Sequence, residues 1–201
     1  MNRSITNTRP IILLVRGLPG SGKSYLVREL HKILGDETVV LDPDATDNQS
    51  KQYRDHVEDS NTNGVDPKLH AYRFLRAQAY QGIAENKIII WNQPFTNLDI
   101  FNKMVANLHK HAAEHELSLT VFVVEVQIDT DVARQRIMKR KSEGGHGPSD
   151  ATFKRFGEDY RSFAPDGYDT VTVNGQDSVQ DSANTVLQAL QGLLSHPELR
   201  S

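Results

Sequence analysis

The residue types most able to do chemistry stand in one short segment, 17–24, which reads Gly-Leu-Pro-Gly-Ser-Gly-Lys-Ser. This is the pattern of a phosphate-binding loop, in which glycines let successive backbone N–H groups turn inward around phosphate oxygens. A lysine at this position can reach the β- and γ-phosphates of a nucleotide, and the hydroxyl that follows it can ligate Mg²⁺. The segment therefore predicts ATP and Mg²⁺ as cofactors. The residues expected to bind them are Gly17, Gly20, Ser21, Gly22, Lys23 and Ser24.

The sequence on both sides of the loop has the pattern that the motif needs. Residues 11–15 form an apolar, largely β-branched run, which is typical of a buried strand. Residues 25–34 carry apolar side chains at helical spacing, and Gly35 is a suitable stop. Strand, glycine loop and helix in this order indicate a working phosphate-binding unit.

The rest of the chain alternates between short apolar runs and amphipathic helical patterns. Such alternation indicates βαβ units, and hence a parallel sheet covered on both faces. We therefore predict a three-layer α/β fold with a five-stranded parallel sheet, in a single domain over 1–201. The segment 46–66 is polar and rich in Asp, Asn and Ser, so we expect it to be mobile or irregular and to lie on the substrate side. Beyond the first strand and helix, strands are expected at 38–41, 88–91, 119–126 and 169–173, and helices at 67–86, 98–115, 131–141, 149–163 and 179–194.

Polar side chains follow the second and third predicted strands. Ligands of parallel sheets bind beyond the carboxyl ends of the strands, so these residues are candidates for the site. Asp44 is the candidate general base and a candidate Mg²⁺ ligand, and Asp42 projects to the same side of the extended chain. Asn92 and Gln93, together with Asp42, are expected to bind the substrate. The alternative for both aspartates is a helix cap or an Asx turn.

The segment 134–163 has the composition of a closing lid. A basic helix, which includes Arg136, leads into a glycine-rich stretch with Gly144, Gly145 and Gly147, and a second basic helix follows. Closure of such a pair would bring guanidinium groups onto phosphates and exclude water, and we expect Arg136 to contact the nucleotide. The alternative is a solvated basic face joined by an ordinary loop.

These motifs together resemble the zeta-toxin and polynucleotide-kinase-like group of P-loop kinases. The resemblance covers about residues 10–165 and rests on segment 17–24, the Asp42-Pro43-Asp44 element, and the series Arg140, Gly144-Gly145-His146, Arg155-Phe156. It implies a five-stranded kinase core that transfers the γ-phosphate of ATP to a hydroxyl. It also implies that Asp44 acts as general base and that Arg140 and Arg155 contact the transferring phosphate. For a toxin, it implies a neutralising antitoxin partner, which no residue here indicates.

The phosphate acceptor stays open between two branches of this group. Trp91 stands where relatives place an acidic residue, and Ala45-Thr46-Asp47 stands where polynucleotide kinases carry Asp-Tyr-Arg. The favoured acceptor is a small molecule such as a nucleotide-sugar, and the alternative is the 5′-hydroxyl of a polynucleotide. A third hypothesis is a nucleotide-dependent ATPase or switch with no acceptor.

Composition limits the class of protein. The chain of 201 residues has a net charge of −3, which argues against non-specific coating of nucleic acid. The longest purely apolar runs are far shorter than the roughly 20 residues of a membrane helix. Residues 1–10 are polar, and the chain has no cysteine. We expect a soluble cytoplasmic protein without a membrane partner.

Overall fold

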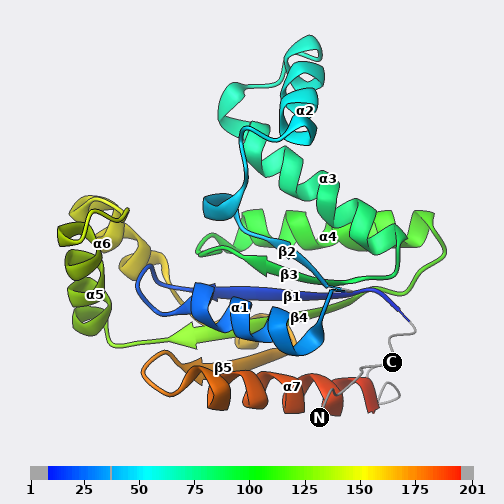
Figure 1. Ribbon diagram of the computed structural model, residues 1–201. Coiled ribbons are helices and arrows are strands. Elements are labelled where there is room, and N and C mark those ends of the chain that lie inside the picture. Colours follow the sequence, from blue (N-terminus) through cyan, green and yellow to red (C-terminus); the bar gives the residue numbers. More distant parts are fainter. Residues whose placement is uncertain (1–8, 37, 196–201) are drawn as a thin grey trace.

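A five-stranded parallel sheet forms the centre of the protein (Figure 1), in a computed structural model that describes residues 9–36 and 38–195. The strand order is β2-β3-β1-β4-β5. β1 is the central strand, and all of its residues are buried, as the apolar run predicts. The strands are β1 (Ile11–Gly17), β2 (Thr38–Leu41), β3 (Ile88–Asn92), β4 (Thr120–Gln127) and β5 (Thr170–Asn174).

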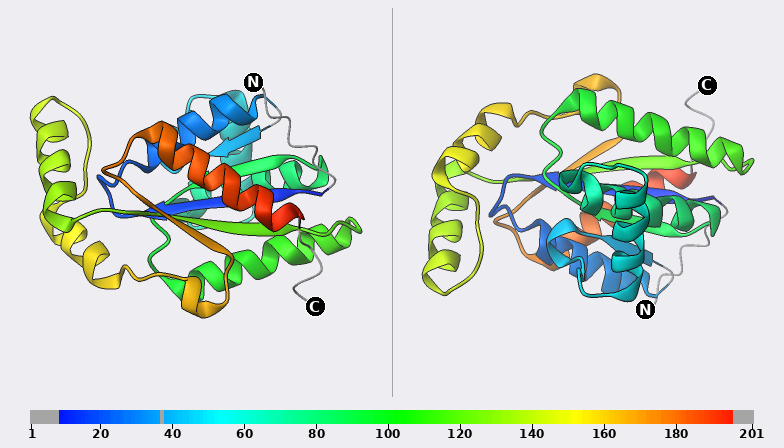
Figure 2. Two further views of the ribbon diagram at one scale, coloured as in Figure 1. Left: turned by 90° about the horizontal axis from the view of Figure 1, so that it is seen from below. Right: turned by 90° about the horizontal axis from the view of Figure 1, so that it is seen from above.

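Helices cover both faces of the sheet, which confirms the predicted three-layer fold (Figures 1 and 2). On one face, α1 (Lys23–Leu34) and α7 (Val179–Ser195) pack their apolar sides against β1, β4 and β5. On the other face, α3 (His70–Ala84) and α4 (Leu98–Glu114) bury theirs against β1, β2, β3 and β4. Side chains of β1 alternate between these two cores, because successive residues of a strand point to opposite faces.

The connection between β2 and β3 contains a helix where the sequence predicts an irregular segment. β2 leads through the short η1 (Pro43–Ala45) to α2 (Lys51–Thr62), and η2 (Pro67–Leu69) precedes α3. The Ser50 hydroxyl caps α2 by accepting a hydrogen bond from the Tyr53 N–H. The rings of Tyr53 and His56 pack on Phe74 of α3. The prediction for 46–66 is therefore wrong over α2, because capping and these ring contacts, rather than an apolar stripe, stabilise this helix.

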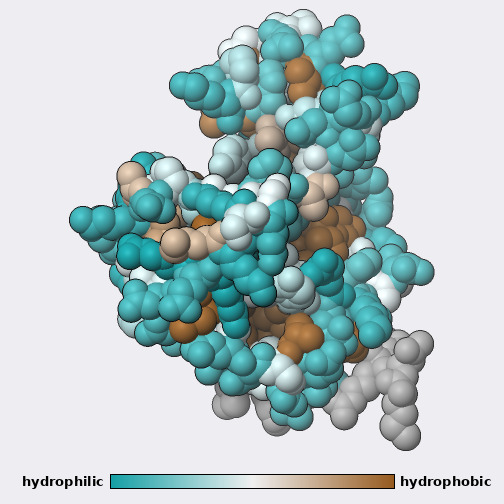
Figure 3. Space-filling model, turned by 60° about the vertical axis from the view of Figure 1, so that its left-hand side comes forward, coloured by the Kyte–Doolittle hydropathy of each residue, from teal (hydrophilic) through white to brown (hydrophobic). Residues whose placement is uncertain are grey.

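A second helical pair, α5 (Thr130–Ser142) and α6 (Asp150–Asp159), lies beyond the carboxyl ends of the strands (Figures 1 and 2). Its two helices share a small apolar cluster of Ala133, Ile137 and Phe153. The predicted helix over 149–163 ends earlier than expected, and the chain then passes through η3 (Ala164–Asp166) to β5. Figure 3, in which this side comes forward, shows a mostly hydrophilic surface with the α2 region projecting above it.

No helix among the described residues is long and apolar enough to cross a membrane. Residues 1–8, which belong to the polar start considered above, lie outside the described part of the chain.

Candidate active site

The phosphate loop lies between the end of β1 and the start of α1, and its glycines are required by its surroundings. Gly20 and Gly22 have φ angles of 84° and 103°, in the left-handed region that favours glycine. A Cβ atom on Gly17 would overlap the carbonyl oxygen of Val126, and one on Gly20 would lie 2.6 Å from the carbonyl oxygen of Ala133. The loop is thus pressed against the end of β4 and the first turn of α5, where only glycine fits.

Lys23 is buried inside this loop. Its ammonium donates hydrogen bonds to the carbonyl oxygens of Gly17, at 2.8 Å, and Leu18, at 2.9 Å. Burial lowers the pKa of Lys23 to about 8; the carboxylates of Asp42 and Asp44 oppose this shift, and the Arg140 guanidinium adds to it. All three of these charges therefore lie close enough to act on the lysine.

Asn92, at the end of β3, links the loop to the residues that follow β2. Its amide nitrogen donates to the Ser24 hydroxyl at 3.2 Å and to Asp42 Oδ2 at 2.6 Å. The hydroxyl and the carboxylate thus share one hydrogen-bonding neighbour. Hydroxyl and carboxylate oxygens are ligands that Mg²⁺ accepts, usually beside phosphate oxygens and water. This pair of oxygens therefore fits the predicted cation.

The two aspartates have different environments. Asp42 is half-buried, and its Oδ1 accepts a hydrogen bond from the Asp44 N–H at 2.9 Å, so the capping alternative is realised in this residue. Its other oxygen still faces Asn92. Asp44 is exposed on η1, so its carboxylate is accessible to an acceptor molecule. Gln93 donates a backbone hydrogen bond to the carbonyl of Val15, but no side-chain contact joins it to the other candidates within the described residues.

The arginines of α5 and α6 differ in how closely they approach the loop. Arg136 donates to the carbonyl of Gly175 at 2.9 Å and to that of Gly20 at 3.4 Å. Arg140 makes a long contact of 3.5 Å to the carbonyl of His146, and its charge acts on Lys23. Arg155 is exposed on α6, and no hydrogen bond or ion pair connects it to the other candidates in the described part of the chain. Arg136 and Arg140 are thus near the phosphate loop, and Arg155 is not in contact with it.

The loop after β5 also belongs to this site. A Cβ atom on Gly175 would overlap the carbonyl oxygen of Ser21, so this backbone lies directly against the phosphate loop. Arg136 bridges the two segments. The sequence marks the Asn174-Gly175 pair as a turn, and the resemblance to P-loop kinases implies a secondary site near the adenine. The packing of the two backbones has no signal in residue type beyond the glycine itself.

An ion pair that the sequence analysis missed lies behind the loop. Arg16, the residue before Gly17, contacts Glu125 of β4 with 2.5 Å between Nη1 and Oε1, and both side chains are completely buried. The signal for it was present: each charge interrupts an otherwise apolar strand. Opposite charges in two neighbouring buried strands indicate an ion pair.

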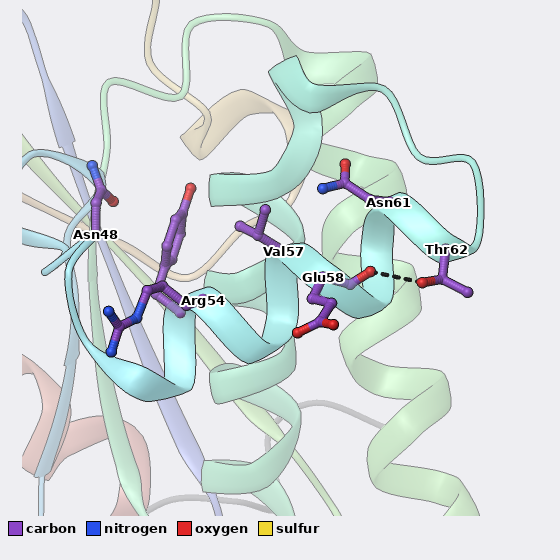
Figure 4. A pocket seen from close by; sticks show the side chains of 7 residues that line it. Asn48, Arg54, Val57, Glu58, Asn61 and Thr62 are labelled. Carbon is purple, nitrogen blue, oxygen red and sulfur yellow. Dashed lines mark hydrogen bonds between the residues drawn. The ribbon is translucent and has the colours of Figure 1, made fainter.

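Two hollows flank the site without including the phosphate loop. One, of about 410 Å³, runs along α2 and is lined by Asn48, Arg54 and Glu58 among others (Figure 4). It lies on the connection that follows η1. The other, of about 590 Å³, lies between the ends of β4 and β5 and the start of α7, with Asp129 and Asp181 on its walls.

The site combines a buried lysine in a strand–glycine loop–helix unit, carboxylates that follow β2, and a helical pair beyond the strand ends. These features define an α/β protein of the P-loop kinase type. The chain belongs to the AAA domain family AAA_33, whose model matches residues 12–165. No curated protein matches the chain.

Solved structures share this fold at low sequence identity. A candidate kinase from Chloroflexus aurantiacus has a TM-score of 0.62 and 22% identity, over 93% of this chain and 98% of that one. A gluconokinase from Sinorhizobium meliloti has a TM-score of 0.59 and 15% identity, over 96% and 98% of the two chains. A chain of the PezAT toxin–antitoxin system of Streptococcus pneumoniae has a TM-score of 0.61 and 13% identity, over 96% and 90%. The resemblance to a P-loop kinase core is thus confirmed at the level of fold.

Proposed function

We propose that the protein is an ATP- and Mg²⁺-dependent kinase that transfers the γ-phosphate to a hydroxyl of a small molecule, such as a nucleotide-sugar. One observation carries this proposal: Lys23 is buried in the phosphate loop, and Asn92 joins Ser24 of that loop to Asp42, which directly precedes η1 with Asp44. Phosphoryl transfer needs a cation for the phosphates, an anchor for the metal and a base for the acceptor. These side chains supply each of them.

Lys23 and the loop amides hold the β- and γ-phosphates. The ammonium exchanges the carbonyls of Gly17 and Leu18 for phosphate oxygens, which are stronger acceptors. Ser24 and Asp42 would hold Mg²⁺, because the Asn92 amide donates hydrogen bonds to an oxygen of each. The bound cation neutralises charge on the phosphates. This assignment moves the metal ligand from Asp44 to Asp42.

Asp44 accepts the proton of the acceptor hydroxyl. Its carboxylate is exposed, and its backbone is fixed by the hydrogen bond to Asp42 Oδ1. A fixed backbone with a free carboxylate suits a base that must meet a separate molecule. The acceptor then lies next to Asp44; the hollow shown in Figure 4, which is lined by Asn48 and residues of α2, follows shortly along the chain and is the candidate space for the rest of the molecule.

The α5–α6 pair acts as a lid, as expected for 134–163. Arg136 and Arg140 already lie beside the phosphate loop, whereas Arg155 reaches the transferring phosphate only when α6 moves toward it. Closure would exclude water, which favours transfer to the acceptor over hydrolysis.

The structures of similar fold support a small-molecule acceptor, since one is named a gluconokinase and another a sugar kinase. The similarity to a chain of a toxin–antitoxin system supports an antitoxin partner as a further proposal. The net charge of −3 favours a small acceptor over a polynucleotide.

The test is a transfer assay with ATP labelled on the γ-phosphate. The acceptors are UDP-sugars, gluconate and other sugars, and 5′-hydroxyl oligonucleotides, each with Mg²⁺. A labelled small molecule that is lost with Lys23→Ala and with Asp44→Asn supports the proposal. Release of free phosphate alone would identify an ATPase or switch, and label on oligonucleotides would identify the polynucleotide branch.

A further inference from the structure

The buried pair of Arg16 and Glu125 lies between the phosphate loop and the end of the α5–α6 pair. The two residues are direct partners in the register of β1 and β4, so their side chains leave the sheet on the same face. Both are 0% exposed. Burial lowers the pKa of Arg16, and the neighbouring carboxylate opposes that shift. The mechanism proposed above uses neither residue.

The hydrogen bonds of the pair reach the chain that leaves α6. Arg16 Nη1 donates to the carbonyl of Arg161 at 2.7 Å, and Glu125 Oε1 accepts from the Phe163 N–H at 2.8 Å. Arg16 Nε also donates to the carbonyl of Phe95, after β3, at 3.2 Å. One guanidinium thus fixes two segments beside the strand that enters the phosphate loop.

Aromatic rings enclose the same guanidinium. Its Cζ atom lies 3.6 Å from the ring centroid of Phe163 and 4.4 Å from that of Tyr160. Tyr160 is the residue that ends α6. Cation–π contacts of this kind are strongest where water is excluded. The end of α6 is therefore held on the residue that precedes Gly17.

Stability alone does not account for this arrangement. Arg16 Nη2, Glu125 Oε2 and the Tyr160 hydroxyl are buried without a hydrogen-bond partner among the described residues. A buried ion pair with unsatisfied atoms is often no more stable than apolar side chains of the same volume. The pair instead fixes the positions of neighbouring segments, because each of these hydrogen bonds holds a backbone group at a defined place.

We propose that Arg16 and Glu125 are positioning residues that fix the C-terminal end of the lid to the phosphate loop. This inference rests on the proposed function, in which α5 and α6 close over bound nucleotide. With the 160–163 end fixed, the lid turns about that end, and its arginines approach the phosphates along one path. Fixed geometry of this kind matters because small misplacements of charged groups slow transfer strongly.

The absence of cysteine in the chain makes the lid position directly measurable. Cysteines introduced by Ser142→Cys on α5 and Gln188→Cys on α7 replace exposed residues and accept spin labels. Pulsed electron resonance then gives the distribution of distances between lid and core, first without nucleotide and then with Mg²⁺ and a non-hydrolysable ATP analogue.

Three variants are compared in this labelled background. Tyr160→Ala removes the ring from Arg16, whereas Tyr160→Phe keeps the ring and removes only the unpartnered hydroxyl. The double variant Arg16→Met with Glu125→Leu replaces the charges by apolar side chains of similar size. Leu190→Ala, in the core between α7 and α1, is the control for general loss of stability.

Without nucleotide, we expect the distance distribution to become at least about twofold wider in Tyr160→Ala and in the double variant. Tyr160→Phe and Leu190→Ala should keep the parental width. In the transfer assay, the double variant should lose about tenfold to a hundredfold in kcat with an unchanged KM for ATP.

A parental width in both Tyr160→Ala and the double variant would overturn the inference, as would full turnover in a double variant that folds normally. The measurement without nucleotide tests the anchor by itself. Failure of the parental protein to bind or use ATP would instead overturn the proposed function, and the two results are therefore distinguishable.

Discussion

The Lys23 ammonium is buried and donates hydrogen bonds to two carbonyls of its own loop, those of Gly17 and Leu18. Burial lowers its pKa to about 8, so the charge that must attract phosphates is present at neutral pH and is lost above it. A bound nucleotide brings several negative charges next to the ammonium and favours its protonated form. We therefore expect the affinity for ATP to depend on pH through Lys23.

The first prediction concerns protons taken up on binding. Above pH 8 the free protein carries mostly neutral Lys23, and nucleotide binding protonates it, so affinity falls as the pH rises from 8 toward 10. Calorimetry at pH 9 in buffers of different ionisation enthalpy should show uptake of up to about one proton. Lys23→Met, as the control, should bind weakly and show no such uptake; equal uptake in that variant would contradict the assignment.

The second prediction separates the two aspartates. Asp44→Asn should lower kcat by about 10²-fold or more with little change in ATP affinity, because the base is lost and the loop is intact. Asp42→Asn should raise the Mg²⁺ concentration needed for half-maximal rate by about tenfold. Steady-state kinetics at varied Mg²⁺ distinguishes these effects. A raised Mg²⁺ requirement in Asp44→Asn instead would return the metal to that residue.

Residue patterns predicted the phosphate loop well. The glycines of 17–24 meet its backbone requirements, and Lys23 and Ser24 supply its functional side chains. The patterns also singled out Asp42 and Asn92, but not the hydrogen bond between them, which depends on the adjacent positions of β2 and β3. Arg16 was missed because a charged residue next to an apolar run is usually interpreted as the end of the strand. Its burial depends on Glu125, more than a hundred residues further along the chain.

At the scale of elements, sequence patterns predicted all five strands and most helices, because the strands and the helices α1, α3, α4 and α7 bury apolar side chains in the two cores beside the sheet. The patterns failed for α2, of which only Ser60 is buried. This helix is stabilised by a cap and by the contacts of Tyr53 and His56 with Phe74. Its sequence therefore shows no apolar stripe. The close contact of the β5–α7 loop with the phosphate loop is likewise a property of packing, and no periodic pattern encodes it.

The third prediction tests that contact. Gly175→Ala places a methyl group against the Ser21 carbonyl, so one of the two backbones must shift, and ATP affinity should fall by about tenfold or more. Gly192→Ala on α7 is the matched control, since nothing lies within 4 Å of a Cβ atom there. It should raise the free energy of unfolding by about 0.5–1 kcal/mol and leave affinity unchanged. Equal affinities in the two variants would exclude a role for the loop.

At the scale of the whole molecule, two helical projections extend from the sheet: α2 with the start of α3 at the top of Figure 1, and the α5–α6 pair at its left. The second carries a cluster of exposed basic residues, Lys139, Arg140 and Lys141, just before Gly144, whose φ is 83°. Under the proposed function, these residues change their exposure when nucleotide binds.

The fourth prediction uses that change. Trypsin should cut the free protein after these basic residues, and saturating Mg²⁺ with a non-hydrolysable ATP analogue should slow the cut by about tenfold, because the closed lid opens less often. Cleavage after Arg54 on α2 serves as an internal reference. Mass spectrometry of the fragments over time gives both rates, and protection that persists in Lys23→Ala would show that lid closure does not cause it.

α2 contributes almost nothing to the core, and this affects which substitutions the protein can tolerate. A segment with one buried side chain contributes little to folding, so its outer residues can be exchanged while the sheet keeps its stability. Because this segment borders the proposed acceptor, selectivity can diverge through replacements there without altering the catalytic edge. Related chains with transplanted α2 segments would then differ in what they phosphorylate and share the same melting temperature.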